Sequence, residues 1–147
     1  MQLKLENIQV GNCVSVLEKM PLKGMKSIHR TRLANQLKEK LDRIIKEEKE
    51  IRKDHSHLNE DDEPKIKENG TLDLKVDIEE FRKIMQEFYE DKIVIDGGDS
   101  QVALKSVKNS VEDCEVEWDG KEAVAFEHLY SGFEGEDSKD AKQDGGE

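Results

Sequence analysis

Apolar positions in the first third of the chain repeat with a helical period and predict one long helix over residues 27–53. Lysine, arginine and glutamate fill the other faces of this segment. Two acid–base pairs, Glu39 with Arg43 and Glu48 with Arg52, are spaced i,i+4 with the acid first, which is the favourable order on a helix. The apolar stripe consists of Ile28, Leu33, Leu37, Leu41, Ile44 and Ile51.

The residues before this helix predict a short strand and then a first helix. Leu3 and Leu5 alternate with polar residues, which is typical of a strand or an extended lead-in. Asn7 stands where a helix-capping residue is expected, and the break at residues 21–24 should end the helix. The apolar positions between them are Val10, Val14 and Leu17.

Between residues 54 and 77 the helical period lapses, and an Asn-Gly pair predicts a β-hairpin. Asn69-Gly70 lies between two alternating runs and supplies two residues that readily adopt the positive φ of a type I′ turn. Asp77 then has the position of a helix cap, with Glu80 three residues on as its capping-box partner. We therefore expect a β-ribbon followed by a second helix, which should end near Asp91. The apolar face of this helix contains Ile78, Phe81, Ile84 or Met85, and Phe88.

The last third of the chain predicts a small β/α portion. Residues 92–95 read as a strand, and residues 101–107 as a strand or an irregular segment. Alternation of Cys114, Val116 and Trp118 with acids favours a further strand. Asp119-Gly120 then reads as a hairpin turn or as the entry to a short helix over residues 121–130, and of the two we expect the helix. The side chains that should pack back on the core are Val124, Leu129 and Phe133.

These elements define a mostly helical α+β fold. We expect the long helix and the helix after the hairpin to form an antiparallel helical hairpin, with the β-ribbon at its tip. Residues 1–133 should form a single domain. Residues 134–147 contain acids, lysines and glycines but no large apolar side chain, so we expect a disordered acidic tail.

Charge is abundant and unevenly divided along the chain. Charged residues make up 40% of the sequence, well above the roughly 25% of an average globular domain. Residues 1–53 have 13 basic and 7 acidic side chains, whereas residues 54–147 have 11 basic and 28 acidic side chains. The net charge of −11 is therefore the sum of +6 and −17. Such a split is compatible with simple solubility and with electrostatic steering of a partner.

Metal chemistry finds little support in the sequence. A calcium loop starting at Asn59 would place Pro64 where an EF-hand needs glycine, and Gly70 where it needs the bidentate glutamate. His55 and His57 have no third or fourth ligand nearby, as zinc would require, so we expect surface histidines. No metal ion and no cofactor is predicted.

The sequence contains no clear catalytic motif, so we expect a protein that is not an enzyme. No nucleophile elbow or phosphate-binding loop is present in the sequence. Cys13 lies among apolar residues, which favours a buried, inert thiol, and Cys114 lies between two acids, which disfavour a reactive thiolate. Acids interleave with the basic residues of the long helix, so we expect no direct contact with nucleic acid.

No apolar window approaches the length of a membrane span, and no signal peptide is visible at the N-terminus. Two cysteines far apart in sequence do not form a disulfide framework. The expected location is the cytoplasm, which is the host cytoplasm if the chain is encoded by a phage.

The order of these parts resembles a family of small proteins of tailed phages and prophages. The resemblance covers about residues 1–133, whereas the polar stretch 97–110 and the acidic tail depart from the usual length. It implies genes that lie near tail and lysis genes, and it transfers no activity and no catalytic or binding residue. The matching pieces are Leu3-Lys4-Leu5-Glu6-Asn7, residues 32–53, Lys67-Glu68-Asn69-Gly70, residues 81–95 and residues 121–127.

The function expected from these observations is that of a non-enzymatic accessory protein of a phage or prophage. It would act through protein–protein contact, in virion assembly or on a host factor. The alternative is an acidic protein that imitates DNA and inhibits a host enzyme or defence protein that binds nucleic acid. A hairpin that buries its faces incompletely is also compatible with a homodimer. The candidate contact residues are Ile66, Asn69, Gly70, Leu72, Leu74 and Trp118.

Overall fold

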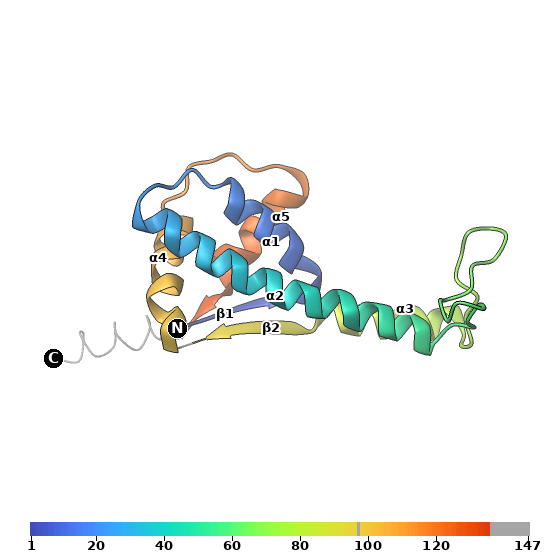
Figure 1. Ribbon diagram of the computed structural model, residues 1–147. Coiled ribbons are helices and arrows are strands. Elements are labelled where there is room, and N and C mark those ends of the chain that lie inside the picture. Colours follow the sequence, from blue (N-terminus) through green and yellow to red (C-terminus); the bar gives the residue numbers. More distant parts are fainter. Residues whose placement is uncertain (97, 136–147) are drawn as a thin grey trace.

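A computed structural model describes residues 1–96 and 98–135, and its fold is a mostly helical α+β arrangement, as predicted (Figure 1). Five α-helices accompany one small sheet of three strands within these residues. In chain order the elements are β1 Gln2–Glu6, α1 Asn7–Lys19, α2 Met25–Asp54, α3 Ile78–Glu90, β2 Lys92–Asp96, a 3₁₀ turn Gly98–Ser100, α4 Gln101–Glu112, α5 Gly120–Gly132 and β3 Phe133–Glu134.

The sheet joins segments that are far apart in the sequence. Its strand order is β2-β1-β3, with both pairings antiparallel. Leu3 pairs with Ile95 and Leu5 with Ile93, and these four side chains are buried on the inner face. The opposite face presents Lys4 and the partly exposed Val94 to solvent. The alternation seen in the sequence therefore corresponds to a sheet with one covered face.

The main core is built around α1, which packs against both α2 and α5. Its buried side chains are mostly aliphatic and come from every part of the described chain except residues 45–92. Fully buried members include Leu17 of α1, Leu37 of α2, Leu104 of α4 and Leu129 of α5. We call this part of the molecule the body; it contains the sheet, α1, α4, α5 and the first half of α2.

The second half of α2 extends away from the body, and α3 returns beside it in the opposite direction (Figure 1). Residues 55–77, which we call the ribbon, connect the two helices at the far end. This second half of α2, the ribbon and α3 together form the arm. The predicted helical hairpin with a ribbon at its tip is therefore present, and β2 leads the chain back to the body.

The ribbon is more closed than a single hairpin. The backbone N–H of His57 donates to the carbonyl of Asp73, that of Asp73 to Lys65, and that of Lys65 back to His57, at 2.7–2.9 Å. Three extended segments thus meet pairwise, in place of the two that were predicted. Isolated bridges connect Ser56 with Leu74, Leu58 with Pro64 and Ile66 with Leu72.

The turn at Asn69-Gly70 is not of type I′, which would require positive φ at both residues. Only Gly70 has a positive φ, of 86°. Its N–H donates to the carbonyl of Lys67, and Lys67 N–H donates to the carbonyl of Thr71, so the loop has three residues. The Asn69 side-chain oxygen accepts from the N–H and the hydroxyl of Thr71. This local bond favours the longer turn over the two-residue one.

Both predicted helix caps are corrected in detail. Asn7 is the first residue of α1 rather than its cap, and its side chain donates to the carbonyl of Phe88 at 2.8 Å. Asp77 does occupy the cap position of α3, but its side chain makes no capping hydrogen bond. The Asn7 side chain, which the local pattern predicted to cap α1, therefore makes a tertiary hydrogen bond to α3.

The last third contains one helix more than predicted. Residues 101–112 form α4, whereas a strand or irregular segment was expected for 101–107. Residues 114–118 are extended but pair with no strand among the described residues, so the strand predicted there is wrong. The central strand β1 is paired on both sides by β2 and β3, and residues 114–118 pair with the outer edge of neither of these two strands.

The predicted helix at 121–130 is confirmed as α5, with its apolar face shifted by one residue. Leu129 is fully buried and Phe133 packs partly against the core, as expected. Val124 is 47% exposed, however, and Ala125 is buried in its place. Glu134, which was predicted to be the first residue of the tail, belongs to β3 and pairs with Gln2 of β1. Residues 136–147 lie outside the described part of the chain.

Candidate functional site

A hollow lined largely by apolar side chains lies between the start of α1 and α3. Its volume is about 480 Å³. Phe81 and Met85 form its buried floor, and Ile8, which is half exposed, stands at its side. The remaining lining residues are Glu6, Arg82, Gln86, Tyr89 and Glu90. Charged and polar groups thus surround an apolar floor.

A second hollow, of about 570 Å³, lies where the ribbon meets the start of α3. Phe81 lines this hollow as well, so the two are adjacent along α3. We call the combined depression the α3 groove. The apolar residues that line the second hollow besides Phe81 are Leu72, Leu74, Val76 and Ile78.

The structure divides the predicted contact residues into two places. Leu72 and Leu74 are half buried in the α3 groove, whereas Ile66 is 58% exposed on the other hairpin segment. Asn69 and Gly70 are exposed at the tip of that hairpin. The ribbon is therefore partly packed on α3 and partly free for contact.

Trp118 does not join them. It lies in the body, half buried against the core, and stacks on Phe126 with ring centroids 6.1 Å apart. Trp118 therefore belongs to the body, whereas the other predicted contact residues belong to the ribbon of the arm.

Ile8, Phe81 and Met85 were not among the predicted contact residues. The sequence did contain a signal for two of them, because Ile78, Phe81 and Met85 fall on one helical face. That face was expected to be covered by the long helix. Phe81 and Met85 are indeed covered, at 9% and 8% exposed, but they lie outside the main core cluster and form the groove floor. Ile8 had no comparable signal, because its position beside α3 depends on the β1–β2 pairing.

Two polar clusters hold α3 in place. At mid-arm, the Tyr89 hydroxyl donates a hydrogen bond to the Glu48 carboxylate, and Arg52 pairs with the same carboxylate at 2.9 Å. Loss of hydration, followed by the hydrogen bond to Glu48, raises the pKa of Tyr89 above its usual value. This cluster ties α3 to α2 across the arm.

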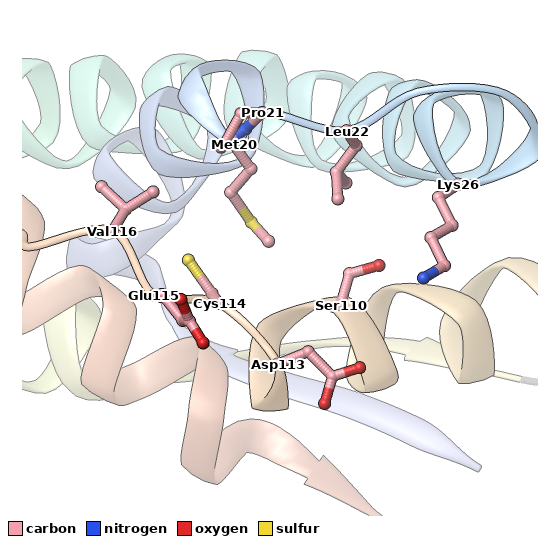
Figure 2. Close-up of a pocket in the computed structure, with 9 residues that line it drawn as sticks. All are labelled: Met20, Pro21, Leu22, Lys26, Ser110, Asp113, Cys114, Glu115 and Val116. Carbon is pink, nitrogen blue, oxygen red and sulfur yellow. The ribbon is translucent and has the colours of Figure 1, made fainter.

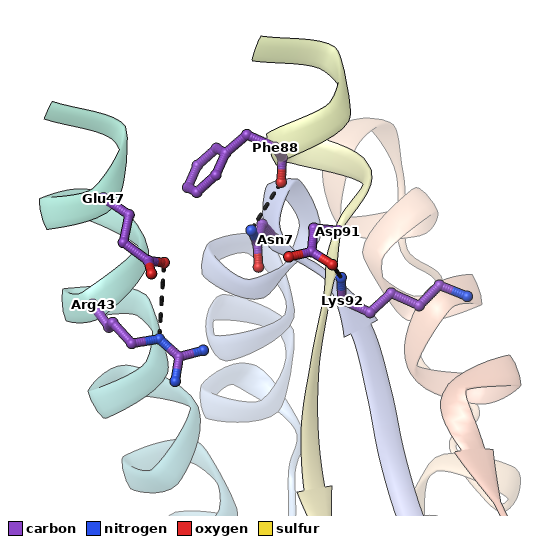
Figure 3. Close-up of polar contacts among 6 residues, drawn as sticks. All are labelled: Asn7, Arg43, Glu47, Phe88, Asp91 and Lys92. Carbon is purple, nitrogen blue, oxygen red and sulfur yellow. Dashed lines mark hydrogen bonds and ion pairs between the residues drawn. The ribbon is translucent and has the colours of Figure 1, made fainter. Parts of the chain in front are cut away.

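At the root of the arm, Asn7 ties α3 to the body (Figure 3). Its side-chain Nδ2 donates to the Phe88 carbonyl at 2.8 Å, and its backbone N–H donates to the Asp91 carbonyl at 2.7 Å. Phe88 projects from the end of α3 towards α2 and packs partly against the core. Asn7, only 6% exposed, therefore fixes where α3 ends relative to α1.

The groove lies in the acidic part of the chain. Residues 59–91 contain twelve acidic and five basic side chains, a net charge of −7. Lys67, Asp77, Arg82 and Glu90 border the apolar floor directly. The acidic run at residues 59–63 forms a turn in which the Asn59 side-chain oxygen accepts from the N–H groups of Asp61 and Glu63. One of the oxygens expected of a calcium loop is thus used within the turn.

The candidate metal ligands do not converge. Among the described residues, no group of three histidine, cysteine, aspartate or glutamate side chains could hold a metal ion. His55 Nδ1 lies 2.7 Å from the Ile51 carbonyl and its ring is tilted against Phe81, while His57 is exposed. Burial raises the pKa of the Cys13 thiol to about 12, which leaves it protonated at neutral pH.

A smaller hollow of about 210 Å³ lies between the α1–α2 connection and the end of α4 (Figure 2). Met20 and Leu22 provide its apolar side, and the Ser110 hydroxyl lies near the Lys26 ammonium (Figure 2). Ser110 Oγ is buried and has no hydrogen-bond partner within the described chain. Cys114 faces Met20 (Figure 2), and Ser110 Oγ is not hydrogen-bonded to Lys26, so no nucleophile is bonded to a base among the side chains that line this hollow.

Within the part of the chain that the structure describes, no helix combines the length and the apolar character needed to cross a membrane.

Fold and site together define a mostly helical α+β protein with a partly apolar groove beside α3 of its projecting arm. Comparison with known proteins adds the family. The chain belongs to the family described as protein of unknown function DUF1617, whose model matches residues 1–142. No curated protein and no solved structure matches the chain.

Proposed function

We propose that the chain acts through protein–protein contact and that the α3 groove is its contact surface. The observation that carries this proposal is the pair of adjoining hollows along α3, whose floor is apolar. Phe81 and Met85 are largely buried outside the main core, and Phe81 lines both hollows whereas Met85 lines one of them. Ile8 and Ile78 beside them are 52% and 47% exposed. Continuous apolar surface of this kind on a soluble protein typically marks an interaction site.

The surroundings of the groove limit the chemistry of its partner. A complementary segment would insert apolar side chains over Phe81 and carry basic side chains on its flanks. The net charge of −7 over residues 59–91 favours such a segment and would accelerate its encounter. An amphipathic helix with a basic polar face meets both requirements, because helices bind grooves through apolar residues on one face.

The setting we propose is that of a non-enzymatic accessory protein of a tailed phage or prophage. It would serve virion assembly or modulate a host factor in the host cytoplasm. Support comes from the resemblance in the order of sequence parts, in which no catalytic motif was found.

Affinity capture with groove variants tests this proposal. The full chain carries a tag and serves as bait in lysates of infected or induced cells. Ile8→Glu and Ile78→Glu place a charge at the groove, and Val124→Glu places one on exposed α5 of the body. Ile78 and Val124 are both 47% exposed, so they form a matched pair. We expect one captured protein to be lost with either groove variant and retained with Val124→Glu.

Equal capture by all variants would contradict the groove, and turnover of a small molecule by the purified chain would contradict a non-enzymatic role. Salt dependence decides between the leading function and imitation of DNA. Capture through an apolar groove should persist at high salt, whereas binding of the acidic residues to a nucleic-acid site should weaken steeply and compete with duplex DNA.

A further inference from the structure

β2 is an edge strand with one side of its backbone unpaired. The sheet order is β2-β1-β3, so β1 covers only one edge of β2. In Figure 1, β2 lies along the lower border of the body and no described helix lies beneath it. Lys92, Val94 and Asp96 are exposed on the open face of the sheet. An edge of this kind is a template for pairing with another strand.

The register shows which backbone groups point outward. Asn7 N–H donates to the Asp91 carbonyl, in continuation of the β1–β2 ladder. In an antiparallel ladder only every second residue bonds to a given neighbour. Asp91, Ile93 and Ile95 therefore bond towards β1, and the backbone groups of Lys92, Val94 and Asp96 point to the free edge. No backbone bond from Val94 to any residue outside the sheet is found within the described chain.

We propose that β2 pairs with β2 of a second copy of this chain, antiparallel and centred on Val94. The sequence Lys-Ile-Val-Ile-Asp suits this pairing because its charges are complementary when one copy is reversed. Val94 then faces Val94 of the other copy, and each Lys92 faces an Asp96. Opposite charges directly across a strand pair are stabilising. The two three-stranded sheets become one continuous sheet of six strands.

Shifting the register by one residue would turn the inner face of one copy outward, because side chains alternate along a strand. Shifting it by two would remove the Lys92–Asp96 pairs and shorten the ladder. The centred register therefore satisfies the backbone, the side-chain faces and the charges together.

One contact opposes this pairing and sets its strength. The N–H of Lys92 already bonds to the Asp91 carboxylate at 3.0 Å (Figure 3). The Lys92 N–H has to leave the Asp91 carboxylate before this N–H can donate to the second copy. Five paired residues also bury less surface than the roughly 1,000 Å² of a specific interface unless the flanking helices add contacts. The expected dimer is therefore reversible and depends on concentration.

Sedimentation equilibrium of the full chain over a wide concentration range gives the first test. We expect a monomer–dimer equilibrium in the wild type. Val94→Pro removes an outward N–H without removing a bond to β1, and proline is tolerated at such edge positions. We expect this variant to weaken dimerisation at least about tenfold, while far-UV circular dichroism and melting temperature show that the body remains folded.

Charge exchange makes the test specific for the proposed register. Lys92→Asp and Asp96→Lys each place like charges opposite one another and should each weaken the homodimer about tenfold. The double variant should restore it, because the complementary charges return in reversed order. Mixing the two single variants should also produce heterodimers, because the two acids on the strand of one variant then face the two lysines on the strand of the other.

A wild type that stays monomeric throughout would overturn the proposal, as would a dimer unaffected by Val94→Pro or by both charge variants. This pairing does not depend on the proposed function. The groove variant Ile78→Glu should leave dimerisation unchanged, and Val94→Pro should leave partner capture unchanged. Failure of one proposal is therefore distinguishable from failure of the other.

Discussion

The body and the arm use apolar side chains in opposite ways. In the body, one core of mostly aliphatic side chains, to which β1, α1, α4 and α5 all contribute, is almost completely removed from water. In the arm, Ile66 and Leu58 are 58% and 40% exposed, and α3 leaves its apolar floor open to two hollows. Polar groups, among them Tyr89 with Glu48, hold the arm together. The body therefore provides most of the stability, and the arm presents surface.

This difference follows from where the contacts lie along the chain. The body joins β1 to β2 and β3, so its formation requires contacts across almost the whole sequence. The arm is continuous in sequence, because the second half of α2, the ribbon and α3 follow one another. Segments with few buried apolar contacts open at lower free-energy cost than the core. We therefore expect the arm to open locally while the body remains folded.

Truncation of a buried leucine should separate the two regions most strongly. Leu129→Ala in α5 leaves a cavity in the body and should lower the free energy of unfolding by about 2–5 kcal/mol. Leu58→Ala in the ribbon should change it by less than about 1 kcal/mol, because Leu58 is already largely hydrated. Chemical denaturation of both variants checks the pair. Similar losses would mean that the ribbon belongs to the cooperative core.

Glycine is needed for different reasons in the two regions: at Gly132 in the body there is no room for a Cβ, and at Gly70 in the arm the backbone has a positive φ. A Cβ at Gly132 would lie 2.6 Å from the Lys4 carbonyl oxygen, so Gly132→Ala should destabilise the body by about 1–3 kcal/mol. A Cβ at Gly70 meets nothing within 4 Å, but the φ of +86° is unfavourable for alanine. Gly70→Ala should therefore cost about 1 kcal/mol, and amide exchange should locate its effect in the ribbon. A global loss of protection in Gly70→Ala would contradict this division.

Asn7→Ala acts at the junction of the two regions. It removes the Nδ2 donor to the Phe88 carbonyl and should cost about 1–2 kcal/mol, because the carbonyl is left without this partner. Amide exchange should rise along α3 before it rises in α1. Thermal unfolding combined with residue-resolved exchange measures both effects. An equal rise in both helices would show that the junction belongs to the body alone.

Tyr89→Phe should produce the smallest loss, about 0.5–1 kcal/mol, and should change the response to alkaline pH. The folded arm raises the pKa of Tyr89, so it disfavours the phenolate more than the unfolded chain does. The stabilisation is therefore complete below the ordinary pKa near 10 and is lost as pH rises through the raised value.

Ultraviolet difference titration between the wild type and Tyr89→Phe isolates the Tyr89 phenolate, while α3 amide exchange follows the arm. Tyr89→Phe should lack the alkaline loss attributable to this residue. A Tyr89 titration at or below its ordinary value would contradict the contact with Glu48.

Elements with a long, regular pattern could be predicted from sequence, and those that depend on pairing could not. α2 and α3 follow from their apolar stripes, and α4 could have been found from Ala103, Leu104, Val107 and Val111 at helical spacing. Residues 114–118 alternate as a strand does, yet they pair with none of the three strands. The prediction failed there because alternation reports extended backbone and leaves the pairing open.

The candidate site divides in the same way. The hairpin residues near Asn69 could be identified because Asn-Gly marks a turn at a surface. The groove floor could not be placed, because the apolar pattern of α3 does not show whether a hollow opens beside its buried face. Ile8 enters the groove only because the β1–β2 ladder and Asn7 bring the start of α1 beside α3.

The sequence alone thus determined the long α2, the projecting ribbon, the acidic character of the arm and the self-complementary charges of residues 92–96, because each depends on neighbouring residues. Tertiary structure alone decided which edge of the sheet stays free, which apolar face stays open and which turn follows Lys67. These outcomes depend on long-range packing, in which one segment receives a partner that another segment then lacks.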